Sequence, residues 1–145
     1  MVDVSAKAET AREAIARATL KVKASTLAAI RAGQLAKGDV LGVARTAGIL
    51  GAKRTSDLIP LCHPLRLTGI DVEFHLDARR SAVTIETRVR TVDKTGVEME
   101  ALTAAAVAGL TVYDMVKAVD RDAMLTDVRL VEKSGGKSGL WKRAR

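Results

Sequence analysis

Residues 70–90 read IDVEFHLDARRSAVTIETRVR, and this stretch decides the fold class. Its two arms alternate apolar and polar side chains with a period of two residues, which is typical of strands with one buried face. The apolar positions are Ile70, Val72, Phe74 and Leu76 in the first arm and Val83, Ile85 and Val89 in the second. The polar segment Asp77–Ser81 lies between the arms, so the sequence predicts an antiparallel β-hairpin.

The segments before this hairpin predict one strand and two helices. Arg12–Lys23 alternates in the same way and favours a strand, although its alanine and arginine content would also suit a helix. Ser25 is a plausible N-cap for a short helix over Thr26–Ala32 that ends at the following glycine. Asp39 is a second plausible N-cap, and it begins a predicted helix over Val40–Arg54.

The segments after the hairpin complete the predicted architecture. Glu98–Val119 reads as a long helix, alternation around Val128 and Leu130 predicts a last strand, and Ser134–Gly139 a loop. The order is β-α-β-β-α-β with an extra short helix early in the chain. This order predicts an α+β fold, with a ferredoxin-like antiparallel sheet and helices packed on one face. Because there are no repeats or low-complexity linkers, we expect residues 1–145 to form one domain.

Composition narrows the class of protein and of partner. Hydrophobic residues make up 48% of the 145 residues and aromatic residues 2%, so we expect a globular chain with an aliphatic core. The net charge of +7 favours an anionic partner. A nucleic acid is the usual partner of a basic chain, but so few aromatics leave little for base stacking. The single Cys62, the absence of a signal peptide and charge-interrupted apolar runs predict a cytoplasmic protein that spans no membrane.

The long helix carries two unusual charges. Between Glu100 and Asp120 only Asp114 and Lys117 are ionisable, and the other positions are apolar in nearly every direction. Both faces of the helix should therefore be buried, one of them against a second subunit of a homo-oligomer. Asp114 and Lys117 share one face at a spacing of three residues. They could form a structural ion pair, or a site in which burial lowers the pKa of the lysine and suits it to proton transfer.

Three further features are candidates for binding. His63 lies between Pro60 and Pro64, which fix an extended backbone, and could bind a ligand or merely pack or cap. Lys37 precedes a helix N-terminus, where anions are favoured, but could be an ordinary solvated lysine. The Ser134–Gly139 run SGGKSG could hold phosphate oxygens. It lacks the spacing and the following helix of a P-loop, and the ligand count excludes a structural zinc site.

Six stretches together resemble one known family in order and spacing. They are MVDVSAK (1–7), KGDV (37–40), AKRTSDLIPLCHPL (52–65), KTGVEMEALTA (94–104), YDMVKAVD (113–120) and EKSGGKSG (132–139). They are similar to the molybdenum cofactor biosynthesis protein C family, the cyclic pyranopterin monophosphate synthases. The resemblance covers almost the whole chain, and PLCHPL with VEMEALTA carries most of it.

The resemblance implies a lyase of molybdenum cofactor biosynthesis. Its substrate would be (8S)-3',8-cyclo-7,8-dihydroguanosine 5'-triphosphate, and its products cyclic pyranopterin monophosphate and diphosphate. It further implies a ferredoxin-like fold and a homohexamer made of three dimers, with the pocket at the dimer interface. No cofactor would be required, and Mg²⁺ bound with the substrate phosphates is left open.

The resemblance also implies roles for individual residues. Asp114, Lys117 and Lys37 fall on catalytic positions of the family. The substrate-binding positions are Leu61, Cys62, His63, Met99, Glu100 and Glu98, and phosphate or wall contacts are Lys133, Lys137 and Arg12. No residue is implied as a metal ligand.

Two other classes of function remain open from the sequence. A small RNA-binding module would expose aromatics on its central strands, where Phe74 is the single candidate. A purely structural oligomer would use Asp114 and Lys117 only as a buried pair, and neutralising both would then leave molybdoenzymes working.

Overall fold

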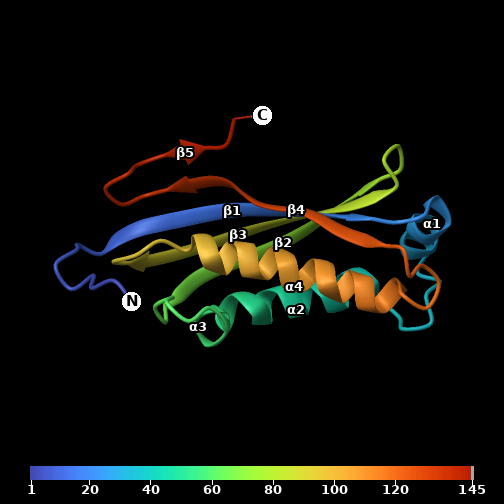
Figure 1. Cartoon of the computed structure of the whole chain (residues 1–145), viewed down its shortest axis with the longest axis horizontal. Helices are drawn as coiled ribbons and strands as arrows, with labels where there is room; N and C mark the ends of the chain where they lie inside the picture. Colours follow the sequence, from blue (N-terminus) through green and yellow to red (C-terminus); the bar gives the residue numbers. More distant parts are fainter. Residues whose placement is uncertain (145) are drawn as a thin grey trace.

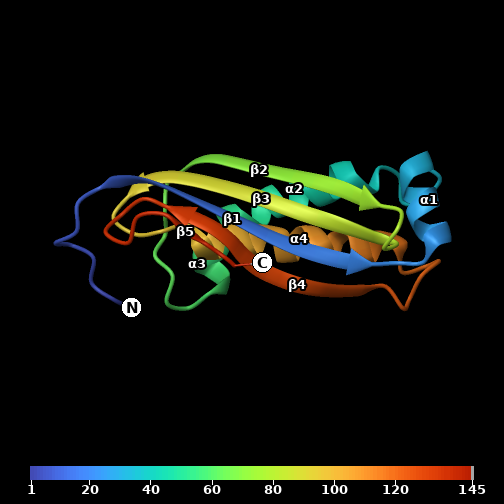
Figure 2. The same cartoon turned by 90° about the horizontal axis from the view of Figure 1, so that it is seen from above.

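The computed structural model describes residues 1–144, in which helices cover one face of an antiparallel sheet (Figures 1 and 2). The strands are β1 (Thr10–Lys21), β2 (Leu67–Asp77), β3 (Ala82–Asp93), β4 (Met124–Ser134) and β5 (Trp141–Lys142). The helices are α1 (Ala24–Ala32), α2 (Val40–Lys53), α3 (Thr55–Leu58) and α4 (Glu98–Val116). The sheet order is β2-β3-β1-β4-β5. The predicted α+β, ferredoxin-like arrangement is therefore confirmed.

The predicted hairpin is the β2–β3 pair. Phe74 pairs with Ile85 and Val72 with Thr87, so the apolar positions of both strands share one face. Val72, Val83, Ile85 and Val89 are buried beneath the helices. The opposite face of the sheet carries charged side chains that pair with one another, such as Arg17 with Glu86 at 2.6 Å. Alternation thus correctly identified which face meets the helices.

Small residues let the helices approach the sheet and each other closely. Ala14, Ala16 and Ala18 of β1 are fully buried, as are Ala101, Ala104, Ala105 and Ala108 of α4. A Cβ atom added at Gly48 of α2 would lie 3.2 Å from the Cβ of Ala108, so α2 packs on α4 with almost no intervening side chain. The core is aliphatic, as predicted, and α4 is its central helix.

Several predicted boundaries differ from the structure. β1 is shifted two residues toward the N-terminus, α2 ends one residue before Arg54, and α3 and β5 were not predicted. The helix α1 begins at Ala24, and its N-cap is Lys23, which was predicted to belong to the strand; Ser25 is not the cap. The helix α4 ends at Val116 instead of Val119, because the chain turns to bring Asp120 against the start of α1.

Candidate active site

Three charged groups meet at the C-terminal end of α4. Asp114 Oδ1 lies 2.6 Å from Lys117 Nζ, and Asp114 Oδ2 lies 2.6 Å from Lys37 Nζ. Lys37 Nζ also donates to the backbone oxygen of Asp114 at 2.8 Å. The predicted Asp114–Lys117 pair is therefore present, and the fold adds Lys37 from the loop between α1 and α2. We call these three residues the lysine cluster.

The helix end itself favours this cluster. The last carbonyl groups of a helix lack intrahelical partners and carry a partial negative charge, so cations are favoured there. Lys117 is the C-cap residue of α4, and Lys37 donates to a last-turn carbonyl. The helix α1 ends at Gly33, as the sequence predicted. Gly33 has φ of 65°, and this left-handed turn starts the loop that carries Lys37.

The lysine cluster is exposed within one chain, so any desolvation of Lys117 would have to come from a second subunit. The side chains of Asp114 and Lys117 are 54% and 51% exposed. Hydrogen bonds from Lys117 and then Lys37 lower the pKa of Asp114 to about 2. The hydrogen bond and charge of Asp114 raise the pKa of Lys117 instead of lowering it. In the single chain, Lys117 is thus a charged hydrogen-bond donor.

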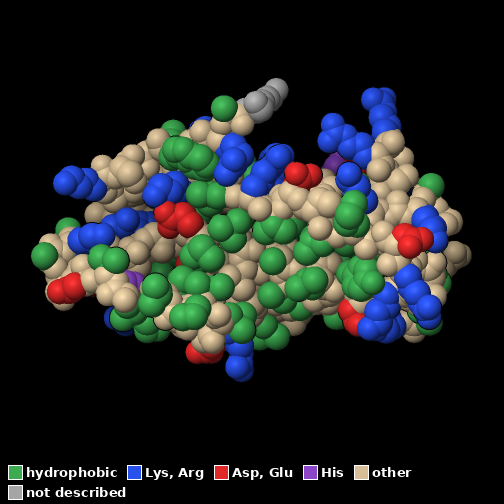
Figure 3. All heavy atoms as spheres, viewed as in Figure 1, with side chains coloured by type: hydrophobic (Ala, Val, Ile, Leu, Met, Phe, Trp, Pro, Cys, Tyr) green, Lys and Arg blue, Asp and Glu red, His purple; other side chains and the backbone are tan. Residues whose placement is uncertain are grey.

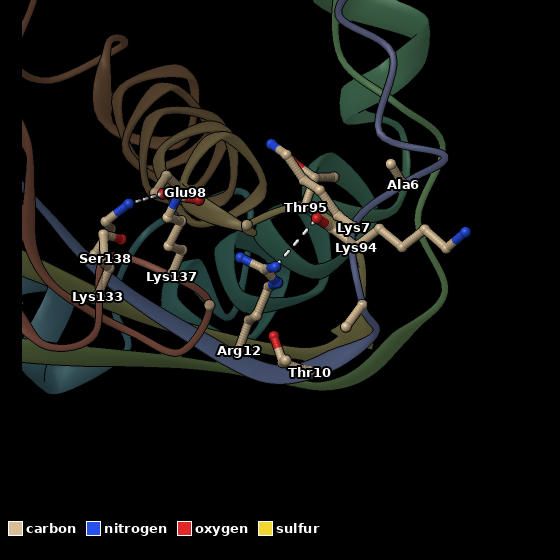
Figure 4. Close-up of a pocket in the computed structure, with 13 residues that line it drawn as sticks. Ala6, Lys7, Thr10, Arg12, Lys94, Thr95, Glu98, Lys133, Lys137 and Ser138 are labelled. Carbon is tan, nitrogen blue, oxygen red and sulfur yellow. Dashed lines mark hydrogen bonds and ion pairs between the residues drawn. The ribbon is translucent and has the colours of Figure 1, made fainter.

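A basic pocket of about 580 Å³ lies at the other end of α4 (Figure 4). Its charged lining consists of Lys7, Arg12, Lys94, Lys133 and Lys137, with Glu98 as the acid. Lys133 Nζ pairs with Glu98 Oε1 at 2.7 Å, which leaves an excess of positive charge in the pocket. Such a lining suits a ligand with several negative charges.

Arg12 and the glycine loop shape this pocket. Arg12 donates from Nε to the oxygen of Asp93 at 3.0 Å and from Nη2 to that of Lys94 at 3.1 Å. These bonds hold the β3–α4 loop, so Arg12 is not a free phosphate ligand in this state. Gly135 and Gly136 adopt φ of 92° and 68°, and a side chain at Gly136 would overlap the Arg12 guanidinium. The predicted loop therefore needs glycine there to lie against Arg12.

A second pocket, of about 210 Å³, adjoins the basic pocket. Leu61, Cys62 and His63 line it from the loop after α3, opposite Met99 and Glu100 of α4. Glu98, Thr95 and Gly96 line both pockets, which makes them neighbours. The fold thus assembles the six predicted substrate-binding residues and the three predicted wall contacts at one end of the molecule, which we call the pocket end.

The lysine cluster and the pocket end are far apart within one chain. Asp114 lies sixteen positions after Glu98 along α4. At a rise of 1.5 Å per residue this is about 24 Å. The predicted catalytic residues and the predicted substrate-binding residues therefore form two separate groups in a single chain, and one small molecule cannot contact both.

Two basic residues of the pocket end were missed from the sequence. Lys7 and Lys94 line the basic pocket, and Lys94 Nζ donates to the backbone oxygen of Ser5 at 3.0 Å. Both lie in stretches that carry the family resemblance, MVDVSAK and KTGVEMEALTA. Their positions in those stretches were the available signal, but only the fold shows that the N-terminal segment lies beside the β3–α4 loop.

Other types of site find little support in the described part of the chain. Residues 1–144 contain no group of three or more histidine, cysteine, aspartate or glutamate side chains placed to hold a metal. Helix α4 is long and apolar enough to cross a membrane by length and composition. It packs against the sheet and α2, however, so its apolar character serves the core. Phe74 lies under Arg45 on the helix-facing side of β2, away from the open face where an RNA-binding sheet would stack bases.

Comparison with known proteins identifies the family. Residues 1–136 match the model of the MoaC family. The chain belongs to the MoaC family.

Curated MoaC relatives match nearly end to end. The protein of Heliobacterium modesticaldum is 62% identical over 143 residues, covering 99% of this chain and 90% of the relative. That of Pelotomaculum thermopropionicum is 59% identical, covering 99% and 84%. That of Thermomicrobium roseum is 57% identical, covering 99% and 86%. Each of these relatives is a cyclic pyranopterin monophosphate synthase.

Glu100 is the acid with the most unusual environment in this MoaC chain. It is 4% exposed, and among residues 1–144 no cation forms an ion pair with it. Burial, with a smaller contribution from the negative charge of Glu98, raises its pKa from 4.5 to about 7. Burial and the Glu100 charge also raise the pKa of the Cys62 thiol. Near neutral pH, Glu100 can therefore exist with or without its proton, which suits a group that exchanges protons with a ligand.

We expect Glu100→Gln to stabilise the protein above pH 7. The folded chain holds the Glu100 proton more tightly than the unfolded chain, whose pKa is near 4.5. The resulting stability is complete below pH 4.5 and is lost as the pH rises through about 7. Glutamine mimics the neutral acid, so the variant should gain up to about 3 kcal/mol over the unchanged chain at pH 8.

Urea unfolding at pH 5 and pH 8 measures this difference in the free energy of unfolding. Glu73→Gln, on the open face of the sheet, is the control and should leave the pH dependence unchanged. If Glu100→Gln unfolds with the same pH dependence as the unchanged chain, the burial of a charged Glu100 is not destabilising and the interpretation is wrong.

Proposed function

We propose that this chain is a lyase that converts (8S)-3',8-cyclo-7,8-dihydroguanosine 5'-triphosphate to cyclic pyranopterin monophosphate and diphosphate. The observation that carries the proposal is membership of the MoaC family, whose curated relatives with that synthase name match 99% of the chain. The basic pocket supports it independently, because a triphosphate needs several cations around it.

The active site is proposed to form between two copies of the chain. The 24 Å span of α4 separates the lysine cluster from the pocket end, as estimated from the helix rise. In a two-fold dimer, residue i of one copy meets residue j of the other and the reverse, so two copies running in opposite directions can join unlike ends. Each site would then take its lysine cluster from one copy and its pocket end from the other.

An exposed apolar surface on the helical face supports this assembly. Figure 3 shows hydrophobic side chains gathered over α2 and α4, with charged side chains toward both ends of the molecule. Val43 and Leu50 of α2 are 45% and 53% exposed, and Leu110 of α4 is 57% exposed. Exposed apolar side chains gathered in one place often mark a protein–protein contact surface. The proposed state is a homohexamer of three dimers.

The residues of the pocket end have two proposed roles, and the lysine cluster has a third. Lys133, Lys137 and Arg12, together with Lys7 and Lys94, would neutralise the triphosphate. Leu61, Cys62 and His63, with Met99, Glu98 and Glu100, would hold the purine-derived rings and the sugar.

The lysine cluster would do the chemistry. Covering it with the partner's pocket end would remove water from Lys117, which opposes the effect of Asp114 and brings the pKa of the lysine down. Lys117 oriented by Asp114 would then exchange protons during ring opening and pterin closure. Lys37 would stabilise negative charge as a sugar hydroxyl attacks the α-phosphate and diphosphate leaves.

The proposed reaction needs no redox partner. The bonds broken and formed redistribute electrons within one substrate, so there is no net oxidation or reduction. Diphosphate is the leaving group. We therefore propose that the chain requires no cofactor, with any Mg²⁺ arriving on the substrate phosphates. From its single cysteine we further propose that it works in the cytoplasm.

The test is turnover of the cyclised triphosphate by purified protein. One cyclic pyranopterin monophosphate and one diphosphate should appear for each substrate consumed, as followed by chromatography and a diphosphate assay. Protein carrying Lys117→Ala and purified in parallel controls for contaminating phosphatases. Release of single phosphates without the pterin product, or no reaction at all, would refute the proposal.

A further inference from the structure

Asp120 is a buried carboxylate that joins two distant parts of the chain. It is 1% exposed, and its Oδ2 accepts hydrogen bonds from the Lys23 backbone N–H at 2.7 Å and from Thr26 Oγ1 at 3.0 Å. Its Oδ1 is buried with no hydrogen-bond partner in residues 1–144, and Lys23 Nζ lies 3.9 Å away. Burying a carboxylate in this way is costly, so stability alone is a poor reason for an acid at this position.

Asp120 supplies the N-terminal cap of α1 that the helix's own residues do not provide. The N-cap residue Lys23 makes no side-chain capping bond. In a capping box, an acid three residues into the helix accepts from the N-cap N–H, but here that position holds Thr26. Asp120 accepts from both residues instead, from a segment more than ninety positions away. The start of α1 is therefore fixed to the segment that follows α4.

The two segments joined by Asp120 each carry one lysine of the lysine cluster. Lys117 lies three residues before Asp120, in a turn closed by hydrogen bonds from the N–H groups of Val119 and Asp120 to the oxygen of Val116, both 2.9 Å. Lys37 follows the other end of α1. It lies in a turn closed by a hydrogen bond from the Gly38 N–H to the Leu35 oxygen, at 3.0 Å. The position of α1 relative to α4 therefore sets how closely Lys37 and Lys117 flank Asp114.

We propose that Asp120 is a positioning residue for the lysine cluster: its carboxylate fixes α1 against the end of α4 so that both lysines reach Asp114. Its effect on turnover rests on the proposed function, whereas its effect on the cluster geometry does not. Without the carboxylate, α1 loses its cap and Lys37 is no longer held against α4. A displacement of about 1 Å can lower a rate a hundredfold.

The pKa of Asp114 reports directly on the two lysines, because they are what lowers it to about 2. Carbon-13 NMR of the Asp114 carboxyl group can follow this pKa without any substrate. With Asp120→Ala, the pKa should rise toward the ordinary 3.8. Asp120→Asn keeps an oxygen acceptor for Lys23 and Thr26, so it should restore the low value. An unchanged Asp114 pKa in the alanine variant overturns the proposal.

The kinetics of the Asp120 variants provide a second test of the proposal. Asp120→Ala should lower kcat about ten- to a hundredfold with little change in KM, since the pocket end is untouched, and Asp120→Asn should recover most of the loss. Val72→Ala removes buried side-chain volume from the middle of β2 and controls for simple loss of stability. Equal kcat in Asp120→Ala and Val72→Ala proteins overturns the proposal.

Two further readouts keep the test decisive. If the alanine variant does not fold, Thr26→Val replaces it: losing one bond to Asp120 should raise the Asp114 pKa and lower kcat by a smaller factor, and no change in either refutes the proposal. If unchanged protein shows no synthase turnover, the proposed function fails, while the NMR result still decides the role of Asp120.

Discussion

Lys117→Ala protein is expected to lose about 10²- to 10⁴-fold in kcat while keeping its fold and its oligomeric state. The side chain is 51% exposed and contributes nothing to the core, so its removal should not unfold the chain. Its loss would remove the group proposed to exchange protons in the site. Lys37→Ala should be similarly inactive, with unreacted triphosphate accumulating, because it removes the other cation at Asp114.

A matched lysine controls for the loss of positive charge. Lys53 is an exposed residue in the last turn of α2, and no ion pair involving it occurs in residues 1–144. Lys53→Ala should keep near-normal kcat. Product formation by chromatography and mass by light scattering measure both parts of the prediction. Near-normal turnover of the Lys117 variant would remove Lys117 from the mechanism, whatever the result for Lys37.

Mixing two inactive variants in one oligomer is expected to restore about a quarter of the activity, if each site takes residues from two copies. Lys117→Ala would inactivate the lysine cluster, and Glu100→Gln the pocket end. In a mixed dimer, one site receives both defects and the other receives neither. Random pairing makes half of the dimers mixed, and one of their two sites is intact.

The control for this experiment pairs two variants from the same cluster. Chains with Lys117→Ala and Lys37→Ala have intact pocket ends, but every site in a mixed dimer of these chains contains one defective lysine cluster. No activity should return. Co-expression with two different tags, followed by purification on both, isolates the mixed oligomers for assay. Recovery equal in the two mixtures, or absent from both, would contradict a site shared between copies.

The fold could be predicted largely from the sequence because its sheet has one buried and one charged face. Alternation in β2 and β3 identified both strands and the side that meets the helices. The start of α1 was missed because its capping acid, Asp120, lies in a distant part of the chain. The short α3 and β5 were missed because elements of four and two residues leave little periodic signal.

The site was less accessible from sequence patterns. The Asp114–Lys117 pair stood out as two charges on an apolar helix. The third member, Lys37, lies 77 residues away from Asp114. Its place before a helix marked it only as a candidate anion ligand, and its catalytic role was assigned by resemblance alone. The exposure of this pair could not be read from neighbouring residues, because the surface around it depends on α1 and on any partner. The separation of the cluster from the pocket end follows only from the length and straight course of α4 (Figure 1).

The alanine-rich contacts of α4 with the sheet and with α2 fix the distance between the two ends of this helix. Ala101, Ala104, Ala105 and Ala108 have no side-chain rotamers to rearrange, so their packing fixes both the height and the rotation of the helix. Removing one residue from α4 would turn everything beyond it by about 100° and shorten it by about 1.5 Å. In the proposed dimer, the lysine cluster would then no longer face the pocket end of the other copy. If the site is shared as proposed, α4 has to keep its residue count for the two halves of the site to coincide, whereas the exposed tip of the β2–β3 hairpin is under no such constraint.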